Sequence, residues 1–229
     1  MSSFQLKVLA AVFMVIDHVG LFFFPNVILL RVVGRLSFPL FAWMIANGAR
    51  HTRDIDAYLW RLFACALISQ VPFVVANQII GMPLWFFDVI FTLFLGLLAI
   101  KFIKRTNRKT WWVFITAVCA VAAYAFNTDY GAFGVVCVVL FYLFYGDMKK
   151  LAIWQGVLFA LQFLVQIFSM RIQFHVFPAG LFYYIEPVGL LSLFFVHAYN
   201  SKQGRRSRFF YYFYPLQYLV IALLLWLKK

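Results

Sequence analysis

Charged side chains, and acidic ones above all, are scarce in this chain of 229 residues. Only 12% of the residues are charged, with 7 acidic against 20 basic side chains, whereas roughly 25% are charged in a soluble domain. Hydrophobic residues make up 66% of the sequence, and no polar segment is long enough for a separate soluble domain. The composition therefore excludes an ordinary soluble protein and predicts one integral-membrane domain over residues 1–229.

The fold class follows from the lack of water in a lipid bilayer. Lipid offers backbone polar groups no hydrogen-bond partners, so only helices and closed barrels can span it. The apolar runs here are longer and more continuous than the alternating strands of a barrel. We expect an all-α protein, a polytopic bundle of transmembrane helices.

Several motifs of known chemistry are also absent. The sequence contains no GxSxG nucleophile elbow, no HExxH motif and no GxGxxG motif. Its cysteines, Cys65, Cys119 and Cys137, lie in apolar runs without the spacing of metal ligands. We interpret them as packing residues and expect no metal site.

The apolar runs predict nine membrane-spanning helices with the N-terminus in the cytoplasm. With this count, fifteen of the 20 basic residues fall in loops on one side, which the positive-inside rule assigns to the cytoplasm. This distribution also explains the net charge of +13 without nucleic acid, because basic turns suit a helix bundle in an anionic membrane. The predicted spans are Leu6–Phe24, Val27–Ala49, Ala57–Val75, Leu84–Ile103, Trp111–Phe126, Gly131–Tyr145, Leu151–Met170, Phe177–Ala198 and Phe209–Leu227.

An Asp-His pair, Asp17-His18, interrupts the first predicted span. Ionisable groups at membrane depth cost about 2.5–3.5 kcal/mol each on insertion scales. A carboxylate beside an imidazole is a common proton-transfer pair, because the ring titrates near neutral pH. We favour a functional role for this pair, with a satisfied structural hydrogen bond as the alternative.

Other ionisable groups gather in the predicted outer halves of the helices. Arg31 and Arg35 lie one helical turn apart and can share a face. For these two arginines, structural ion pairing and chemistry both stay open, and we expect one of them to pair with Asp17 or Asp88. For the acidic residues Asp88 and Asp129 we favour a structural role. Glu186 is a further candidate for mutual pairing.

A second basic group lies at the predicted cytoplasmic edge, where the second helix ends and the third begins. Arg50, His51, Arg53 and Arg61 are dense enough there to accept phosphates through charge-assisted hydrogen bonds. Basic residues at this edge often serve topology alone, which is the alternative. The basic segments Lys101–Lys109 and Lys202–Arg208 are expected to be solvated turns.

Short blocks along nearly the whole chain resemble the TraX family of membrane proteins. They are Leu6-Lys7, Ile16–Gly20, Leu30–Ala42, Gly48–Arg53, Ile68–Phe73, Phe91–Leu93, Asp129–Ala132, Tyr199–Gly204 and Phe210–Leu216. This family is named for a conjugation protein that N-acetylates F-type pilin, and it is distantly similar to transmembrane acyltransferases. Gln70, Asp88 and Gln217 depart from the pattern, since the family usually has Glu, Asn and His there. The missing histidine removes one candidate proton carrier.

The resemblance implies a multi-pass enzyme of the bacterial inner membrane that uses acetyl-CoA as co-substrate. The acceptor is expected to be an amine or hydroxyl, such as a pilin N-terminus or a small molecule. In this interpretation the basic edge holds the CoA phosphates, and a polar cleft between the second and third predicted helices reaches His18. His18 takes the acceptor's proton, Asp17 orients its ring, and Arg31 or Arg35 stabilises oxyanion charge.

Two other classes of function stay open. A proton-coupled small-molecule transporter also uses acidic, basic and histidine side chains at the membrane midplane. A non-catalytic envelope assembly protein fits the absence of a histidine at position 217.

Overall fold

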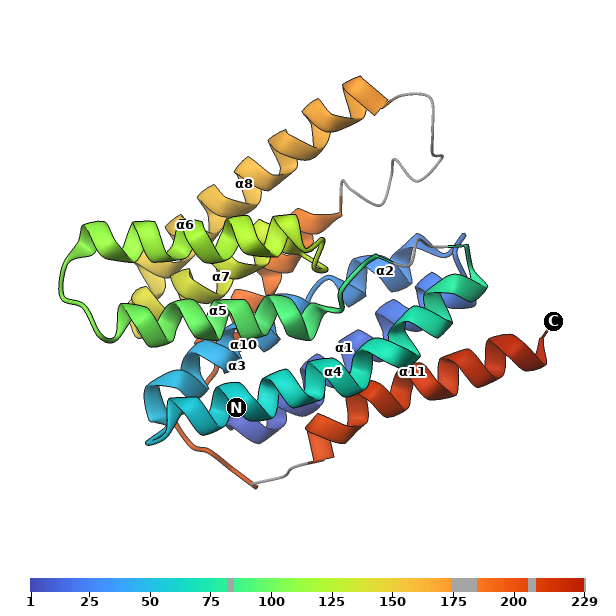
Figure 1. Cartoon of the computed structure of the whole chain (residues 1–229), viewed down its shortest axis with the longest axis horizontal. Coiled ribbons are helices and arrows are strands. Elements are labelled where there is room, and N and C mark those ends of the chain that lie inside the picture. The colour runs from blue at the N-terminus through green and yellow to red at the C-terminus, as the bar shows by residue number, and fades with distance from the viewer. Residues whose placement is uncertain (82–84, 174–184, 206–208, 229) are drawn as a thin grey trace. The chain divides into compact units, whose positions relative to one another are not determined.

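The computed structural model describes residues 1–81, 85–173, 185–205 and 209–228, and these residues form an all-α protein (Figure 1). Within them the only strand-like pairing is an isolated bridge between Phe87 and Thr128. The all-α part of the predicted fold class is therefore confirmed. The elements are α1 (Ser3–Phe22), α2 (Ile28–Gly34), α3 (Ser37–His51), α4 (Ile55–Ile79), α5 (Val89–Ile103), α6 (Lys109–Ala125), α7 (Gly131–Leu143), α8 (Met148–Gln173), η1 (Glu186–Leu191), α10 (Ser192–His197) and α11 (Phe209–Leu227).

Five segments among the described residues are long and apolar enough to cross a membrane. They are Ser3–Phe22, Ile28–His51, Ile55–Ile79, Met148–Phe168 and Phe209–Leu227. The helices α5, α6 and α7 are shorter; the 15 residues of α5, for example, rise roughly 22 Å, less than the ~30 Å hydrocarbon core. The count of nine spans and the cytoplasmic N-terminus thus stay predictions. Part of the eighth predicted span, residues 177–184, and the basic residues at 206, 208 and 229 lie outside the described residues.

The second predicted span, Val27–Ala49, agrees with the candidate span Ile28–His51, but it is not one continuous helix. The structure divides it into α2 and α3, with Arg35 and Leu36 between them. Pro39 accounts for the break, because its ring would clash with the carbonyl four residues earlier, at Arg35, in an unbroken helix. Proline is tolerated in the first turn of α3, where its missing N–H is not needed. Ser37 Oγ also donates to the Ala10 carbonyl at 2.9 Å, which ties the start of α3 to α1.

The chain forms two compact units, each built from segments distant in sequence. The first unit combines Met1–Met44 with Phe144–Arg205, and the second combines Ile45–Leu143 with Arg206–Lys229. The single domain expected over the whole chain stays a prediction. In the first unit α1 packs along α2, and η1 packs against α8. The Lys202 carbonyl accepts from the Ser3 N–H at 2.9 Å, so the segment after α10 is held against the start of α1.

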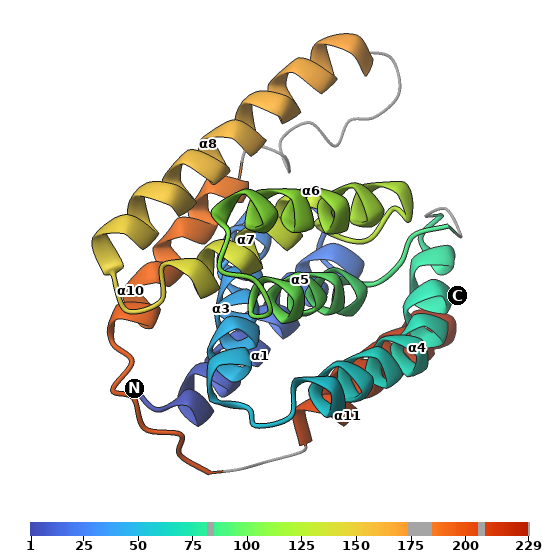
Figure 2. The same ribbon diagram turned by 60° about the vertical axis from the view of Figure 1, so that its left-hand side comes forward.

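The second unit contains two sets of packed helices. α4 and α11 run side by side, and α5, α6 and α7 pack against one another, as both views show (Figures 1 and 2). Gly96 of α5 allows one of these close approaches, because a Cβ there would lie 2.8 Å from the Val138 side chain of α7. The cysteines Cys65, Cys119 and Cys137 are buried thiols, in agreement with their interpretation as packing residues.

The second unit also gives Asp88 and the turn before α7 clear structural roles. Asp88 is fully buried, and its Oδ1 caps α5 by accepting from the Ile90 N–H at 2.9 Å. Gln70 on α4 holds the same segment, because its Oε1 accepts from the Asp88 N–H at 3.0 Å. The Asp129 N–H donates to the Phe87 carbonyl at 2.8 Å and links the turn to the start of α5. Asp88 therefore has a structural role, as the sequence suggested, and that role is to cap the N-terminus of α5.

Candidate functional site

Four charged side chains of the first unit form a connected ion network. Arg31 Nη1 lies 2.5 Å from Asp17 Oδ2, and Arg35 Nη2 lies 2.8 Å from the same oxygen. Arg35 Nη2 also donates to Asp17 Oδ1 at 2.9 Å. The other terminal nitrogen of Arg35, Nη1, lies 2.5 Å from Glu186 Oε1. We call Asp17, Arg31, Arg35 and Glu186 the ion network.

Two glycines let α1 and α2 approach closely enough for this pairing. A Cβ at Gly34 would overlap the Asp17 side chain, and one at Gly20 would lie 2.8 Å from Leu30 Cβ. Arg35 stays one turn after Arg31, because its N–H donates to the Arg31 carbonyl at 3.1 Å. Both guanidinium groups can therefore reach the single carboxylate of Asp17.

The ion network is partly buried and carries no formal net charge. Its side chains are only 10–14% exposed, and two arginines balance two carboxylates. An unpaired charge in such surroundings would be strongly destabilising, whereas a balanced network is tolerated. The prediction that Arg31 or Arg35 pairs with Asp17 or Asp88 is confirmed, for both arginines and with Asp17.

His18 follows Asp17 in α1 and is buried, with 8% of its surface exposed. Its ring meets the Phe22 ring edge-on, with the two centroids 6.3 Å apart. Successive helix residues point about 100° apart, since a turn takes 3.6 residues. Both oxygens of Asp17 accept from arginines, so its main observed contacts are with the ion network. Orientation of the His18 ring by Asp17 stays a prediction.

The predicted basic edge lies in the second unit, around the end of α3 and the start of α4. Arg50 Nη2 donates to the Tyr142 carbonyl at 2.7 Å, and its guanidinium lies 4.9 Å from the centre of the Tyr142 ring. His51 Nδ1 lies 2.8 Å from the Asn47 carbonyl. Arg53 and Arg61 are exposed, and Arg61 lies over the Tyr58 ring. The edge therefore presents cations supported by carbonyls and aromatic rings.

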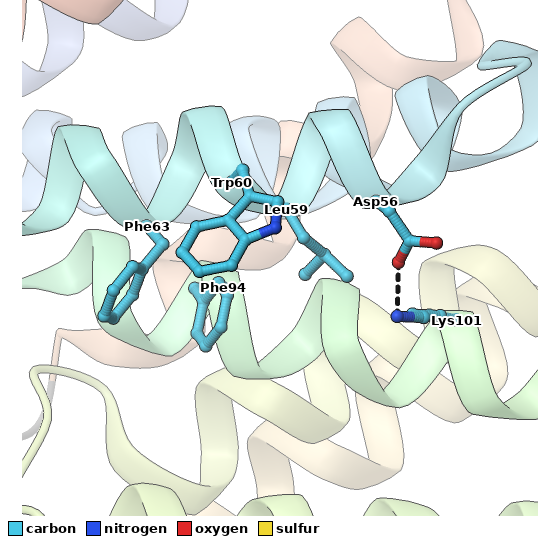
Figure 3. A pocket seen from close by; sticks show the side chains of 6 residues that line it. All are labelled: Asp56, Leu59, Trp60, Phe63, Phe94 and Lys101. Atoms are coloured by element: carbon cyan, nitrogen blue, oxygen red, sulfur yellow. Dashed lines mark ion pairs between the residues drawn. The ribbon is translucent and has the colours of Figure 1, made fainter.

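A cavity of about 310 Å³ opens between α4 and α5 in the same unit (Figure 3). Lys101 closes one end of it through an ion pair with Asp56, so this lysine is not in a simple solvated turn. The predicted cleft was placed instead between the second and third predicted helices and was expected to reach His18. His18 belongs to the first unit and the basic edge to the second, so the path between them stays a prediction.

The structure gives three residues a specific contact that the sequence did not identify. Glu186 was a candidate for pairing, but its partner Arg35 lies 151 residues away, so no local sequence pattern identifies that partner. Gly34 matters because of its contact with Asp17. Lys104 joins the basic edge by donating to the Ala49 carbonyl at 3.0 Å. In the sequence, only the position of Lys104 within the basic segment Lys101–Lys109 pointed to this role.

A family model and one known protein match almost the whole chain. The family model described as TraX protein matches residues 2–225. A "probable fimbrial assembly protein FimC, serogroup H1" of Dichelobacter nodosus is 36% identical over 244 residues, which cover 97% of this chain and 94% of that protein. An uncharacterized protein of Rickettsia prowazekii (strain Madrid E) is 42% identical over 38 residues, 17% of this chain and 15% of that protein. No solved structure matches significantly.

Proposed function

Because this chain belongs to the TraX family, we propose that it is a membrane-embedded acetyltransferase. It moves an acetyl group from cytoplasmic acetyl-CoA to an amine or hydroxyl acceptor near the outer leaflet. The observation that carries the proposal is a buried histidine, His18, directly after Asp17 of a partly buried ion network in an apolar helix. Such groups are expensive in a membrane and mark functional sites there.

The chemical step needs a proton acceptor and a means to stabilise negative charge. The acetyl–sulfur bond of the donor breaks while the acetyl–nitrogen or acetyl–oxygen bond of the product forms. His18 takes the proton that the acceptor loses and returns it to the leaving thiolate. Arg31 and Arg35 bring positive charge in surroundings of low dielectric, where it stabilises the oxyanion more than it would in water.

The observed contacts suggest a distinct role for the two carboxylates in this step. Asp17 and Glu186 hold the guanidinium group of Arg35 between them, at 2.8 Å and 2.5 Å. A charged group that is already held in place needs little reorganisation when charge develops during the reaction. The carboxylates thus position the arginines and keep the site neutral before the substrates bind.

The basic edge supports the donor side of the proposal. CoA carries several phosphate charges, and arginine is well suited to bind phosphate through two parallel hydrogen bonds. Arg50, His51, Arg53 and Arg61 would hold these phosphates, with Lys104 as an additional cation. The name of the Dichelobacter nodosus relative suggests that the acceptor is a fimbrial subunit.

The test is acetyl transfer by the purified full chain in lipid nanodiscs. Labelled acetyl-CoA is supplied with peptides that carry either a free or a blocked N-terminal amine. We expect the free amine alone to be labelled, and His18→Ala to reduce the rate by about 10²–10⁴-fold, the usual contribution of a general base. The exposed His197 provides the matched control, since His197→Ala should leave the rate unchanged. Equal rates for both variants would refute the role of His18.

A non-catalytic role in fimbrial assembly is a second candidate, favoured by the name of the same relative. It predicts that the purified chain binds no acetyl-CoA but associates with a fimbrial subunit. Equilibrium dialysis with labelled acetyl-CoA separates the two candidates. Association with the subunit in the absence of any acetyl-CoA binding would replace the enzymatic proposal.

The proposed direction of transfer requires a cytoplasmic N-terminus and nine spans in the inner membrane. A reporter fused after Lys202 should then be cytoplasmic, and one fused after Lys229 should be external. A cytoplasmic C-terminus would mean an even number of spans. Because α5, α6 and α7 are short, one of them would then be the miscounted span.

A further inference from the structure

The cavity between α4 and α5 has two chemically distinct ends. Its lining comes from Asp56, Leu59, Trp60 and Phe63 on α4 and from Phe94 and Lys101 on α5. Figure 3 shows the ion pair of Asp56 with Lys101 at one end and the rings of Phe63 and Phe94 toward the other. The Phe63 and Phe94 ring centroids are 5.2 Å apart. The cavity thus combines a charged mouth with an apolar groove.

The position of the ion pair along the helices sets the length of this groove. Asp56 is the second residue of α4, and Lys101 is two residues before the end of α5. Phe63 and Phe94 each lie seven residues from the charged partner on their own helix, which is roughly 10 Å at 1.5 Å per residue. The charges therefore lie at the edge of the apolar helices and the groove runs inward from them, as an acyl chain runs from its headgroup.

The outward face of α4 beside the cavity is apolar and exposed. Trp60 is 69% exposed, and Leu67, Ile68 and Val71 farther along α4 are also more than half exposed. Such side chains on a helix long enough to span a membrane face lipid. Trp60, near the charged end, suits the water–lipid interface, where tryptophan is enriched. The surroundings of the cavity therefore favour a membrane lipid as its occupant.

The charge of the lining decides which lipid fits. One carboxylate and one ammonium group leave the lining with no net charge, which disfavours a polyanion such as the acetyl donor. A headgroup that carries both a phosphate and an ammonium group complements both side chains. We infer that the cavity is a binding site for a phospholipid with a phosphoethanolamine headgroup. Lys101 binds the phosphate, Asp56 binds the ammonium group, and one acyl chain lies along Leu59, Phe63 and Phe94.

Native mass spectrometry of the full chain in mild detergent tests this inference. The protein is mixed with phosphatidylethanolamine or with phosphatidylglycerol, which lacks the ammonium group. We expect at least fivefold more bound phosphatidylethanolamine and a loss of this preference in Asp56→Ala. Lys101→Ala should weaken the binding of both lipids, because both carry the phosphate. Lys150→Ala is the matched control, because Lys150 pairs with Asp147 in a second surface ion pair that does not line the cavity.

A variant that exchanges the two charges distinguishes lipid binding from a purely structural role of the ion pair. The double variant Asp56→Lys with Lys101→Asp keeps a pair but reverses its direction, so it should remain folded and lose the preference. Retention of the preference in this variant would overturn the inference, as would equal binding of both lipids by the natural chain. Asp56→Asn, which keeps the size of the side chain but removes its charge, replaces the exchange if the double variant does not fold. Loss of the preference in that folded variant supports the inference, and its retention overturns it.

Discussion

The ion network and the basic edge use arginine in opposite ways. In the ion network the side chains of Arg31 and Arg35 are only 12% and 10% exposed, and carboxylates hold both of them. At the basic edge Arg50 and Arg61 are exposed, and the contacts described for them are a backbone carbonyl and tyrosine rings. The difference follows from solvation, because a buried cation needs a compensating anion whereas water can solvate an exposed one. The exposed guanidinium groups of the edge are therefore accessible to an anionic ligand from solvent.

The largest expected effect comes from removing the central carboxylate of the ion network. Asp17→Ala removes the carboxylate that Arg31 and Arg35 share, and the protein should lose about 3–5 kcal/mol of stability. Thermal unfolding and the folded fraction on size-exclusion chromatography in detergent measure this loss. Adding Arg31→Leu should recover part of it, because Arg35 and Glu186 then balance each other. No recovery in the double variant would show that charge balance is not the cause.

A smaller loss is expected from a single methyl group at Gly34. Its Cβ would overlap the Asp17 side chain, so Gly34→Ala should force α1 and α2 apart and cost about 1–3 kcal/mol. Unfolding in a denaturant series measures this effect. Gly156→Ala in α8 is the matched control, since a Cβ there meets nothing within 4 Å. Equal stability of the two variants would contradict the close packing of α1 on α2.

Substitution at the basic edge should separate binding from stability. Arg53→Gln and Arg61→Gln alter exposed side chains, so stability should change by less than about 0.5 kcal/mol. If the edge binds CoA, each should weaken acetyl-CoA binding by about tenfold, the loss of one charge-assisted contact of roughly 1.4 kcal/mol. Affinity measured over a series of salt concentrations checks this. Lys149→Gln, a change of an exposed cation in α8, should have no effect on affinity.

The smallest effect is expected at an exposed charge near the start of α8. The Lys150 N–H donates to Asp147 Oδ1 at 3.1 Å and lowers the pKa of this carboxyl, with the Lys150 ammonium group as a further cause. A lowered pKa in the folded state stabilises the protein above the unfolded-state pKa, and this contribution is lost as pH falls through the folded-state value. Asp147→Ala should therefore lower the melting temperature slightly at pH 7, with a smaller difference near pH 3. A constant difference across this range would exclude the carboxylate as the cause.

Sequence reasoning named all four residues of the ion network as candidates but did not assign Glu186 its partner, for a physical reason. Arg31 and Arg35 are one turn apart, and their need for an anion at membrane depth pointed to Asp17 as a partner. Glu186 follows Asp17 by more than 160 residues, so only the packing of η1 beside α2 assigns it to Arg35. The break before Ser37 was also missed, although Pro39 carried a signal for it.

The sequence by itself determined that this protein is helical and belongs in a membrane, because its apolar runs can satisfy their backbone hydrogen bonds in lipid only within helices. It also determined where the scarce charges stand along the chain. The tertiary structure decided which of these charges meet. Asp17 pairs with two arginines because Gly20 and Gly34 let α1 and α2 approach, and Asp56 pairs with Lys101 because α4 and α5 lie side by side. Such pairings depend on distances between separate helices, which the order of residues along one helix does not encode.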